Sequence, residues 1–188
     1  MRRIAFAAIA LISVFASPSS AEVDIWSILK KPGHIVLLRH ANAPGSVPES
    51  NDMDFDNCAI QRNLDAGGRA QAARIGDAFR KQGISKATLL SSQYCRAKDT
   101  ATLLKLGPIK TTPDLNQTFL LDPDGMRAAG VKAIATMRTF PLGQFAVLVT
   151  HLTNIQSIAN VSLDPGEFAV VHFDPRGAVV VDGRLAIP

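Results

Sequence analysis

The sequence predicts an α/β domain of three layers, in which a mostly parallel, mixed sheet is flanked by helices. Two observations support this fold class. Short runs of aliphatic and β-branched residues alternate along the chain with segments whose apolar residues recur at three and four positions, as strands and helices do. Two of these runs, Ile35–Leu38 and Phe145–Val149, contain no polar residue, which is typical of strands covered on both faces in a parallel sheet.

The first 21 residues have the pattern of a signal peptide. Arg2 and Arg3 form a basic start, an apolar stretch over 4–16 follows, and small residues precede a cleavage position after Ala21. The apolar stretch is short for a bilayer span, and an uncleaved membrane anchor is the alternative. We expect an exported protein, periplasmic or secreted, whose residues 22–188 form one domain with no stable membrane insertion after cleavage.

The elements follow in order after the leader. A short helix is predicted over 23–30 and the first strand over 34–39. The connection over 41–63 is long for a compact domain, and connections of this length are commonly functional or mobile. We therefore expect this connection to shape the mouth of a site beyond the first strand.

Helical periodicity returns over 69–81, a segment that Gly83 ends, and Ser92 is interpreted as the N-cap of the next helix. The other predicted helices cover residues 93–106, 124–138 and 152–160, and the other predicted strands cover residues 87–91, 109–112 and 145–150. The last segment is predicted as a hairpin of 167–173 and 178–181 with its turn at 174–177, which makes the sheet mixed.

Two histidines end apolar strands that lie far apart in the sequence: Arg39-His40 ends the first, and His151 ends the strand over 145–150. Ligands bind beyond the carboxyl ends of strands in open α/β sheets, so both imidazoles are expected at one edge. A neutral imidazole is a nucleophile toward phosphorus, and a guanidinium binds phosphate oxygens bidentately. We interpret His40 as the nucleophile, Arg39 as a phosphate ligand and protonated His151 as a stabiliser of the transition state.

Two further arginines are candidate phosphate ligands. Arg96 falls in the first turn of the helix over 93–106, where free N–H groups and the helix dipole favour an anion. Arg62 ends the long connection, and a solvated charge is the alternative for both arginines. His34 and His172 are interpreted as structural residues, because one opens its strand and the other alternates with apolar neighbours.

The segment Leu38-Arg39-His40-Ala41 resembles the Arg-His-Gly signature of the histidine phosphatase superfamily, which includes phosphoglycerate mutase-like enzymes and acid phosphatases. Three more segments resemble the family's loop-to-helix segment, its second-arginine segment and the segment of its second histidine, in the family's order: 61–64 with 68–72, 91–101 and 149–151. The resemblance covers nearly the whole chain after the leader and implies a phosphoglycerate mutase-like fold.

The resemblance also implies a chemistry: a metal-independent phosphatase without a cofactor, which forms a phosphohistidine on His40 and acts on a small phosphorylated substrate. The residues expected to bind the phosphoryl group are Arg39, Arg62, Arg96 and His151. The sequence itself has no histidine or cysteine cluster with metal-ligand spacing.

One position departs from the family pattern. Where mutase-like relatives carry a glutamate that protonates the leaving oxygen, this chain has Gln117, whose amide cannot act as an acid. The candidate replacements are Asp52, Asp54, Asp56, Asp114, Asp122 and Asp124. A substrate with a good leaving group, such as a phosphohistidine or an acyl phosphate, needs little help from an acid.

The chain has two cysteines, Cys58 and Cys95. In an exported protein they are candidates for a disulfide, and two free thiols are the alternative. Each lies close in sequence to a candidate arginine, so a bridge would join two walls of one pocket.

Composition argues against a nucleic-acid partner. The chain has 20 Lys and Arg against 16 Asp and Glu, and removal of Arg2 and Arg3 leaves 18 against 16, with no basic run interleaved with aromatic residues. We predict a phosphomonoester hydrolase. The alternatives are a catalytically impaired protein that binds phosphate ligands, and a phosphatase specific for cell-envelope sugar phosphates.

Overall fold

The computed structural model describes residues 24–47, 49–50 and 52–188. The strands are β1 (Ile35–Arg39), β2 (Thr88–Ser91), β3 (Ile109–Thr111), β4 (Ala146–Thr150), β5 (Glu167–Phe173) and β6 (Val179–Ala186). The helices are α1 (Ile25–Leu29), η1 (Cys58–Ile60), α2 (Ala66–Lys81), α3 (Cys95–Leu104), η2 (Pro113–Leu115), α4 (Pro123–Met137) and α5 (Leu152–Ala159), where η marks a 3-10 helix. The predicted signal peptide and the start of the predicted domain 22–188 lie outside the described residues.

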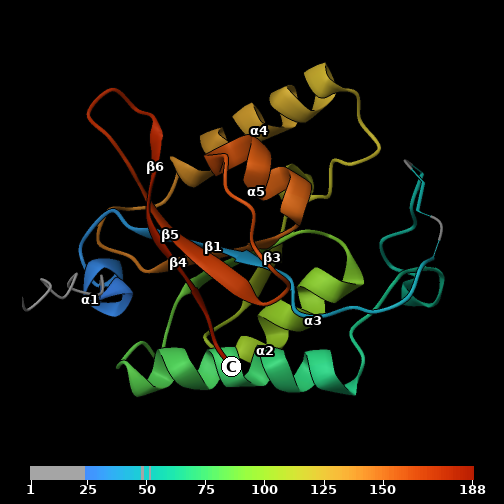
Figure 1. The fold of residues 1–188 in the computed structure, drawn as a ribbon, viewed down its shortest axis with the longest axis horizontal. Coiled ribbons are helices and arrows are strands. Elements are labelled where there is room, and N and C mark those ends of the chain that lie inside the picture. The colour runs from blue at the N-terminus through green and yellow to red at the C-terminus, as the bar shows by residue number, and fades with distance from the viewer. Residues whose placement is uncertain (1–23, 48, 51) are drawn as a thin grey trace, which may run out of the picture.

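The six strands form one sheet in the order β3-β2-β4-β1-β5-β6. The four strands from β3 to β1 run parallel, while β5 is antiparallel to β1 and β6 is antiparallel to β5 (Figure 1). The mostly parallel, mixed sheet is therefore confirmed. The two strands that end at the candidate histidines, β1 and β4, are direct neighbours, with Arg39 opposite Thr150.

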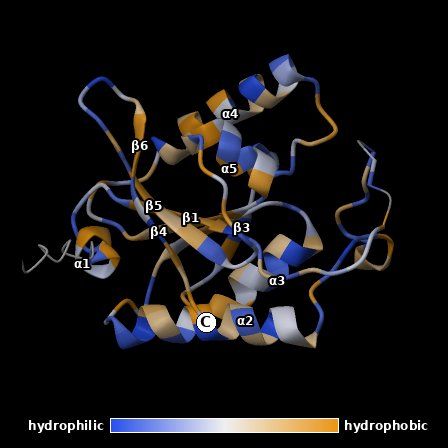
Figure 2. Ribbon diagram, viewed as in Figure 1, coloured by the Kyte–Doolittle hydropathy of each residue, from blue (hydrophilic) through white to orange (hydrophobic). Residues whose placement is uncertain are grey.

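Helices cover both faces of the sheet and complete the predicted three layers. Val36 and Leu38 of β1 pack with Phe79 in the core beneath α1, α2 and α3. The alternate residues Ile35 and Leu37 face the opposite core, beneath α4 and α5. Because β1 serves two cores, it is apolar throughout. Figure 2 shows hydrophobic residues along the central strands and a mixture of hydrophobic and hydrophilic residues along α2.

Most predicted elements end within three residues of their observed bounds, and the larger differences have physical causes. Helix α2 begins three residues earlier than predicted, because the Asp65 side chain caps it by accepting a hydrogen bond from the N–H of Gly68 at 2.7 Å. Strand β6 continues to Ala186, beyond the predicted residue 181, because β5 offers it pairing partners as far as Glu167.

No helix in the described part of the chain is long and apolar enough to cross a membrane.

Candidate active site

The two predicted histidines meet at one edge of the sheet. The backbone N–H of His40 donates to the carbonyl oxygen of Thr150 at 3.0 Å, which continues the β1–β4 ladder by one residue. The ring centroids of His40 and His151 lie 5.2 Å apart in an edge-to-face arrangement, and both side chains are buried. Parallel pairing of two strands that are distant in sequence has therefore placed two imidazoles side by side.

The His40 ring has the protonation that a nucleophile needs. Its Nδ1–H donates to the carbonyl oxygen of Ala41 at 2.8 Å. A carbonyl oxygen only accepts, so the proton is on Nδ1 and the lone pair is on Nε2. Burial lowers the pKa of His40 to about 3, and the positive charge of Arg96 adds to this shift. The ring is therefore neutral at ordinary pH.

His151 is held by two side chains. Its Nδ1 accepts a hydrogen bond from Arg96 at 3.4 Å, and its Nε2–H donates to the hydroxyl oxygen of Ser92 at 2.7 Å. Burial lowers the pKa of His151 well below its usual value, and His40 and Arg96 lower it further. His151 is therefore neutral in the free site, and its protonation in the transition state stays a prediction. A bound phosphoryl dianion would offset the surrounding positive charge and raise this pKa.

Arg96 lies in the first turn of α3, as predicted, but the helix begins differently. Its N-cap is Tyr94, without a side-chain capping bond, and the Ser92 hydroxyl accepts both from the N–H of Tyr94 at 3.2 Å and from the second histidine. Arg96 is only 1% exposed, its guanidinium lies 4.5 Å from the centroid of the Tyr94 ring, and its Nε has no hydrogen-bond partner among the described residues. A buried guanidinium with a free donor at a helix N-terminus is suited to bind an anion.

Arg39 and Arg62 complete a group of three guanidinium groups. Arg39 donates from Nη1 to the carbonyl oxygen of Leu163 at 2.8 Å, and its buried Nε finds no partner in the part of the chain that is described. Burial lowers the pKa of Arg39, which Asp164 opposes and Arg62 reinforces. The charge of half-buried Arg62 also contributes to the lowered pKa of both imidazoles. Positive charge therefore converges on the two rings.

The family model of the histidine phosphatase superfamily (branch 1) matches residues 35–139, more than half of the chain and including the first histidine with all three arginines. The chain belongs to the histidine phosphatase superfamily. The predicted family is confirmed, and membership supports a phosphatase as the coarse class of enzyme. His151 lies beyond the matched segment.

Solved structures share this fold at low identity. A structure of the protein histidine phosphatase SixA complexed with tungstate is 15% identical, with a TM-score of 0.58 over 81% of this chain and 96% of that chain. A protein of Mycobacterium tuberculosis is 14% identical, with a TM-score of 0.64 over 82% and 97% of the two chains. A mycobacterial glucosyl-3-phosphoglycerate phosphatase complexed with VO3 is 14% identical, with a TM-score of 0.58 over 79% and 96%. No curated protein matches the chain.

The sequence analysis did not identify Glu49, which contacts the candidate active site. Its carboxylate accepts hydrogen bonds from Nη1 of Arg96 at 2.7 Å and from Nη2 at 3.3 Å. Only 2% of the Arg96 side chain and 4% of the Glu49 side chain are exposed. A carboxylate held by two N–H groups is negative, as a phosphoryl group bound to the same arginine would be. Glu49 lies in an aperiodic segment, 47 residues from Arg96, so no pattern signals this contact.

Gln117, at the position of the family's acid, donates from Nε2 to the hydroxyl oxygen of Tyr94 at 3.1 Å. Among the residues that the structure describes, none of the carboxyl groups considered as replacements contacts the buried arginine. Asp114 accepts from a threonine hydroxyl, and Asp54 and Asp122 accept from backbone N–H groups. Asp124 pairs with an exposed arginine, and Asp52 and Asp56 are exposed. Within the described residues, the carboxylate that contacts the buried arginine is that of Glu49.

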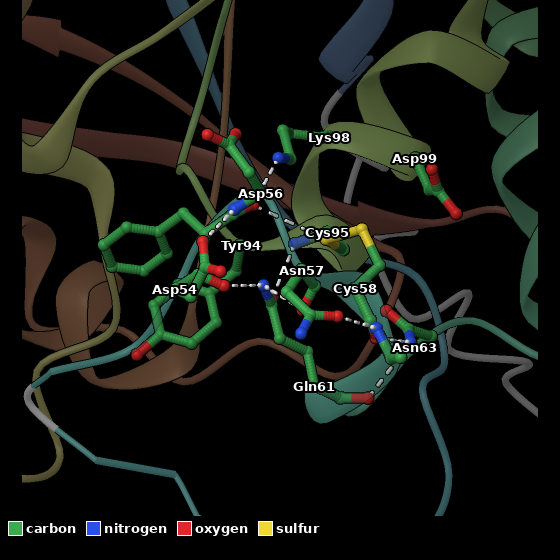
Figure 3. The surroundings of a disulfide bond; sticks show 12 residues. Asp54, Asp56, Asn57, Cys58, Gln61, Asn63, Tyr94, Cys95, Lys98 and Asp99 are labelled. Carbon is green, nitrogen blue, oxygen red and sulfur yellow. Dashed lines mark hydrogen bonds between the residues drawn. A yellow bond between two sulfur atoms is a disulfide. The ribbon is translucent and has the colours of Figure 1, made fainter.

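A disulfide joins the long connection to α3. Cys58 of η1 and Cys95 of α3 are bonded, with an S–S distance of 1.99 Å and Cα atoms 5.7 Å apart. Beside the bridge, the Gln61 side chain donates to the carbonyl oxygens of Asp54 and Asn57 and accepts from the N–H of Cys95 at 2.9 Å (Figure 3). These bonds anchor the segment that carries the half-buried arginine next to the helix that carries the buried one.

Proposed function

We propose that the chain is an exported phosphomonoester hydrolase that works through a phosphohistidine intermediate on His40 and uses neither metal nor cofactor in that reaction. Membership of the histidine phosphatase superfamily supports the class of enzyme. The observation that carries the mechanism is the hydrogen bond from Nδ1–H of His40 to Ala41, because it leaves Nε2 unprotonated among three guanidinium groups.

In the proposed first step, Nε2 of His40 attacks phosphorus. The N–P bond forms, the ester P–O bond breaks, and the leaving oxygen takes a proton from solvent water, because Gln117 cannot supply one. The guanidinium groups of Arg39 and Arg96 hold the non-bridging oxygens, with their unpaired Nε–H groups as available donors. His151 takes up a proton beside the dianion and donates it in a hydrogen bond to a phosphoryl oxygen.

In the proposed second step, water attacks phosphorus, the N–P bond breaks and inorganic phosphate leaves. Before either step, the substrate must displace Glu49 from Arg96, because two negative groups cannot share one buried guanidinium. Glu49 therefore holds the arginine in place in the free enzyme and yields it to the phosphoryl group.

Two substrate classes fit the proposed site. Gln117 supplies no acid, which suits a substrate with a good leaving group, such as a phosphohistidine. The likeness to the protein histidine phosphatase SixA supports a test of this class. The likeness to a phosphatase of a phosphorylated sugar compound, together with proposed export, supports a test of cell-envelope sugar phosphates.

A second candidate function is a catalytically impaired protein that binds phosphate ligands. It is favoured by the amide at position 117 and by the carboxylate that occupies Arg96. This function requires saturable binding of phosphorylated ligands without phosphate release.

The test is a phosphatase screen on residues 22–188 with p-nitrophenyl phosphate, phosphohistidine peptides, sugar phosphates and phosphorylated envelope fragments. We expect turnover and an acid-labile phosphoryl label in the unmodified enzyme, and His40→Ala should remove both, with a loss of at least about a thousandfold. Asp124→Asn, an exposed substitution, is the control. Unchanged turnover in His40→Ala contradicts the mechanism, and binding without turnover in the unmodified enzyme establishes the second function.

We also propose that residues 1–21 are a signal peptide. The pattern of the leader supports export, and so does the disulfide, since disulfides persist in oxidising compartments. The mass of the exported chain tests this proposal: cleavage after Ala21 leaves residues 22–188, and an exported chain that retains the leader contradicts it.

A further inference from the structure

Two histidines and an aspartate meet at the opposite end of the sheet from His40. The Oδ2 atom of Asp182 lies 2.8 Å from Nδ1 of His172 and 3.5 Å from Nε2 of His34. One nitrogen of each ring and one carboxylate oxygen lie within 4.8 Å of one another, and the two ring centroids are 5.3 Å apart. Six residues of extended chain separate His34 from His40, which places this cluster roughly 20 Å from the active site.

Strand register builds the cluster. Ile35 of β1 pairs with Val171 of antiparallel β5, so the next pair along the register sets His34 opposite His172 on one face. In β6, Val181 pairs with Val171 while Gly183 pairs with the preceding residue of β5, which leaves Asp182 as the extra residue of a β-bulge. Bulges redirect side chains, and this one brings the carboxylate to the two rings.

The hydrogen bonds of a neutral His34 ring leave an electron pair facing a carboxylate. Nδ1 of His34 lies 3.1 Å from the carbonyl oxygen of Lys31, which only accepts, so Nδ1 carries the proton. Nε2 of His34 then directs its lone pair at the Asp182 carboxylate. This arrangement is favourable when a cation lies between the two groups. A ring N–H that donates to a backbone carbonyl while the other nitrogen is free is also the usual setting of a metal-binding histidine.

We propose that His34, His172 and Asp182 bind a divalent transition-metal ion of the Zn²⁺ class, with solvent as the fourth ligand. Two imidazoles and one carboxylate suit Zn²⁺ and not Mg²⁺ or Ca²⁺, which prefer oxygen ligands. Ligand atoms around a tetrahedral zinc lie roughly 3.4 Å apart, so the 3.5 Å pair is already spaced and the 2.8 Å pair must open slightly. In the metal-free protein Nδ1–H of His172 donates to Asp182, so metal binding must move this proton to Nε2.

The surroundings allow an ion to enter. The exposed fractions of the three side chains are 13% for His34, 33% for His172 and 18% for Asp182, which leaves room for a solvent ligand. The bound ion would join the start of β1, the end of β5 and the middle of β6, and would stabilise the fold without contact with the active site.

The sequence alone points to structural histidines, because His34 and His172 are far apart along the chain and only antiparallel pairing brings them together. The test is calorimetric titration of tag-free residues 22–188 with Zn²⁺, together with Co²⁺ absorption, which reports tetrahedral coordination. We expect one ion per chain and a higher melting temperature with Zn²⁺.

Asp182→Asn and His172→Ala should weaken binding at least tenfold, because loss of a ligand costs no less than the roughly 10- to 100-fold loss caused by outer-shell changes. Asp182→Asn keeps an acceptor for His172 and so preserves the local hydrogen bond. His40→Ala is the matched control, since it removes an imidazole from the active site and should leave Zn²⁺ affinity unchanged. Absence of stoichiometric binding, or equal binding in Asp182→Asn, overturns the proposal.

Discussion

At the scale of single residues, burial fixes the charge of the His40 imidazole and thereby links stability to pH. The pKa of His40 is about 3 in the folded chain, whereas an unfolded histidine titrates near about 6.5. Between these values the unfolded chain binds the additional proton, so stability falls as pH falls through this window. The pKa of His151 is lowered in the same way.

We therefore expect the free energy of unfolding to decrease by about 1 kcal/mol for each of these two rings between about pH 7.5 and about pH 5.5. Urea unfolding at both pH values measures the decrease. His40→Gln removes one titrating ring, so its decrease should be smaller by about 1 kcal/mol. An equal decrease in this variant would show that the buried ring is protonated in the folded chain.

Glu49 allows a second prediction at this scale, because stability and ligand affinity should respond to its loss in opposite directions. Glu49→Gln removes the charge that compensates buried Arg96, so the unliganded protein should lose about 3 kcal/mol of stability. Inorganic phosphate should bind more tightly, because it no longer displaces a carboxylate. Thermal melts with and without phosphate measure both effects.

Asp52→Asn is the control for Glu49→Gln, since it removes an exposed charge from the same long connection. It should change neither stability nor phosphate affinity appreciably. Weaker phosphate binding in Glu49→Gln would contradict displacement and would instead make the carboxyl group part of the ligand site.

Residue types at strand ends were sufficient to predict most of the site. An arginine and two histidines after apolar runs can be located from the sequence, because the carboxyl ends of parallel strands define the binding edge. Glu49 could not be found in this way. Its position depends on the path of an aperiodic connection, which is set by contacts with residues distant in sequence.

At the scale of elements, the close approach of α2 to the segment after β1 depends on one glycine. A Cβ atom at Gly68 would lie 1.9 Å from the carbonyl oxygen of Asn42, which is backbone and cannot move aside cheaply. A Cβ atom at Gly67 would meet only Asp65 at 3.4 Å, an ordinary contact. The two adjacent glycines therefore form a matched pair.

Gly68→Ala should destabilise the protein by about 1–3 kcal/mol, the usual cost of overpacking. Gly67→Ala should be neutral or slightly stabilising, because alanine favours a helix more than glycine does. Chemical unfolding of both variants measures the difference. Equal stability of the two would mean that the start of α2 shifts freely away from the segment after the first strand.

The observed elements also show which sequence signals were sufficient. Strands β1 and β4 were predicted closely, because burial on both faces demands continuous apolar residues. The extent of β6 was not predicted closely, because its residues are half-buried or exposed and its length is set by pairing with β5. Ser92 was predicted as the N-cap of α3, but the N-cap is Tyr94; the Ser92 hydroxyl accepts from the N–H of Tyr94 at 3.2 Å and from His151 at 2.7 Å.

At the scale of the whole molecule, the site is assembled from three structural parts, which are the sheet, α3 and the long connection. The sheet supplies the two imidazoles, α3 supplies the buried arginine, and the long connection supplies the carboxylate and the half-buried arginine. The mixed, mostly parallel sheet could be anticipated from the alternation of elements, whereas the strand order and the position of the connection could not. The disulfide is the covalent link between that connection and the rest of the site.

Loss of this link should loosen the connection and lower stability together. Cys58 and Cys95 are separated by 37 positions, and closing a loop of this size contributes roughly 4 kcal/mol in the chain-entropy account. For a protein of this size the double variant Cys58→Ser with Cys95→Ser should therefore melt about 8–16 °C lower.

The KM of this double variant should rise more than its kcat falls, because Arg62 would be less well placed while His40 stays fixed by the sheet. Reductant should lower the melting temperature of the unmodified protein to that of the double variant and leave the variant itself unchanged. Equal melting temperatures for the oxidised protein and the double variant would show that the hydrogen bonds of Gln61 suffice to hold the connection.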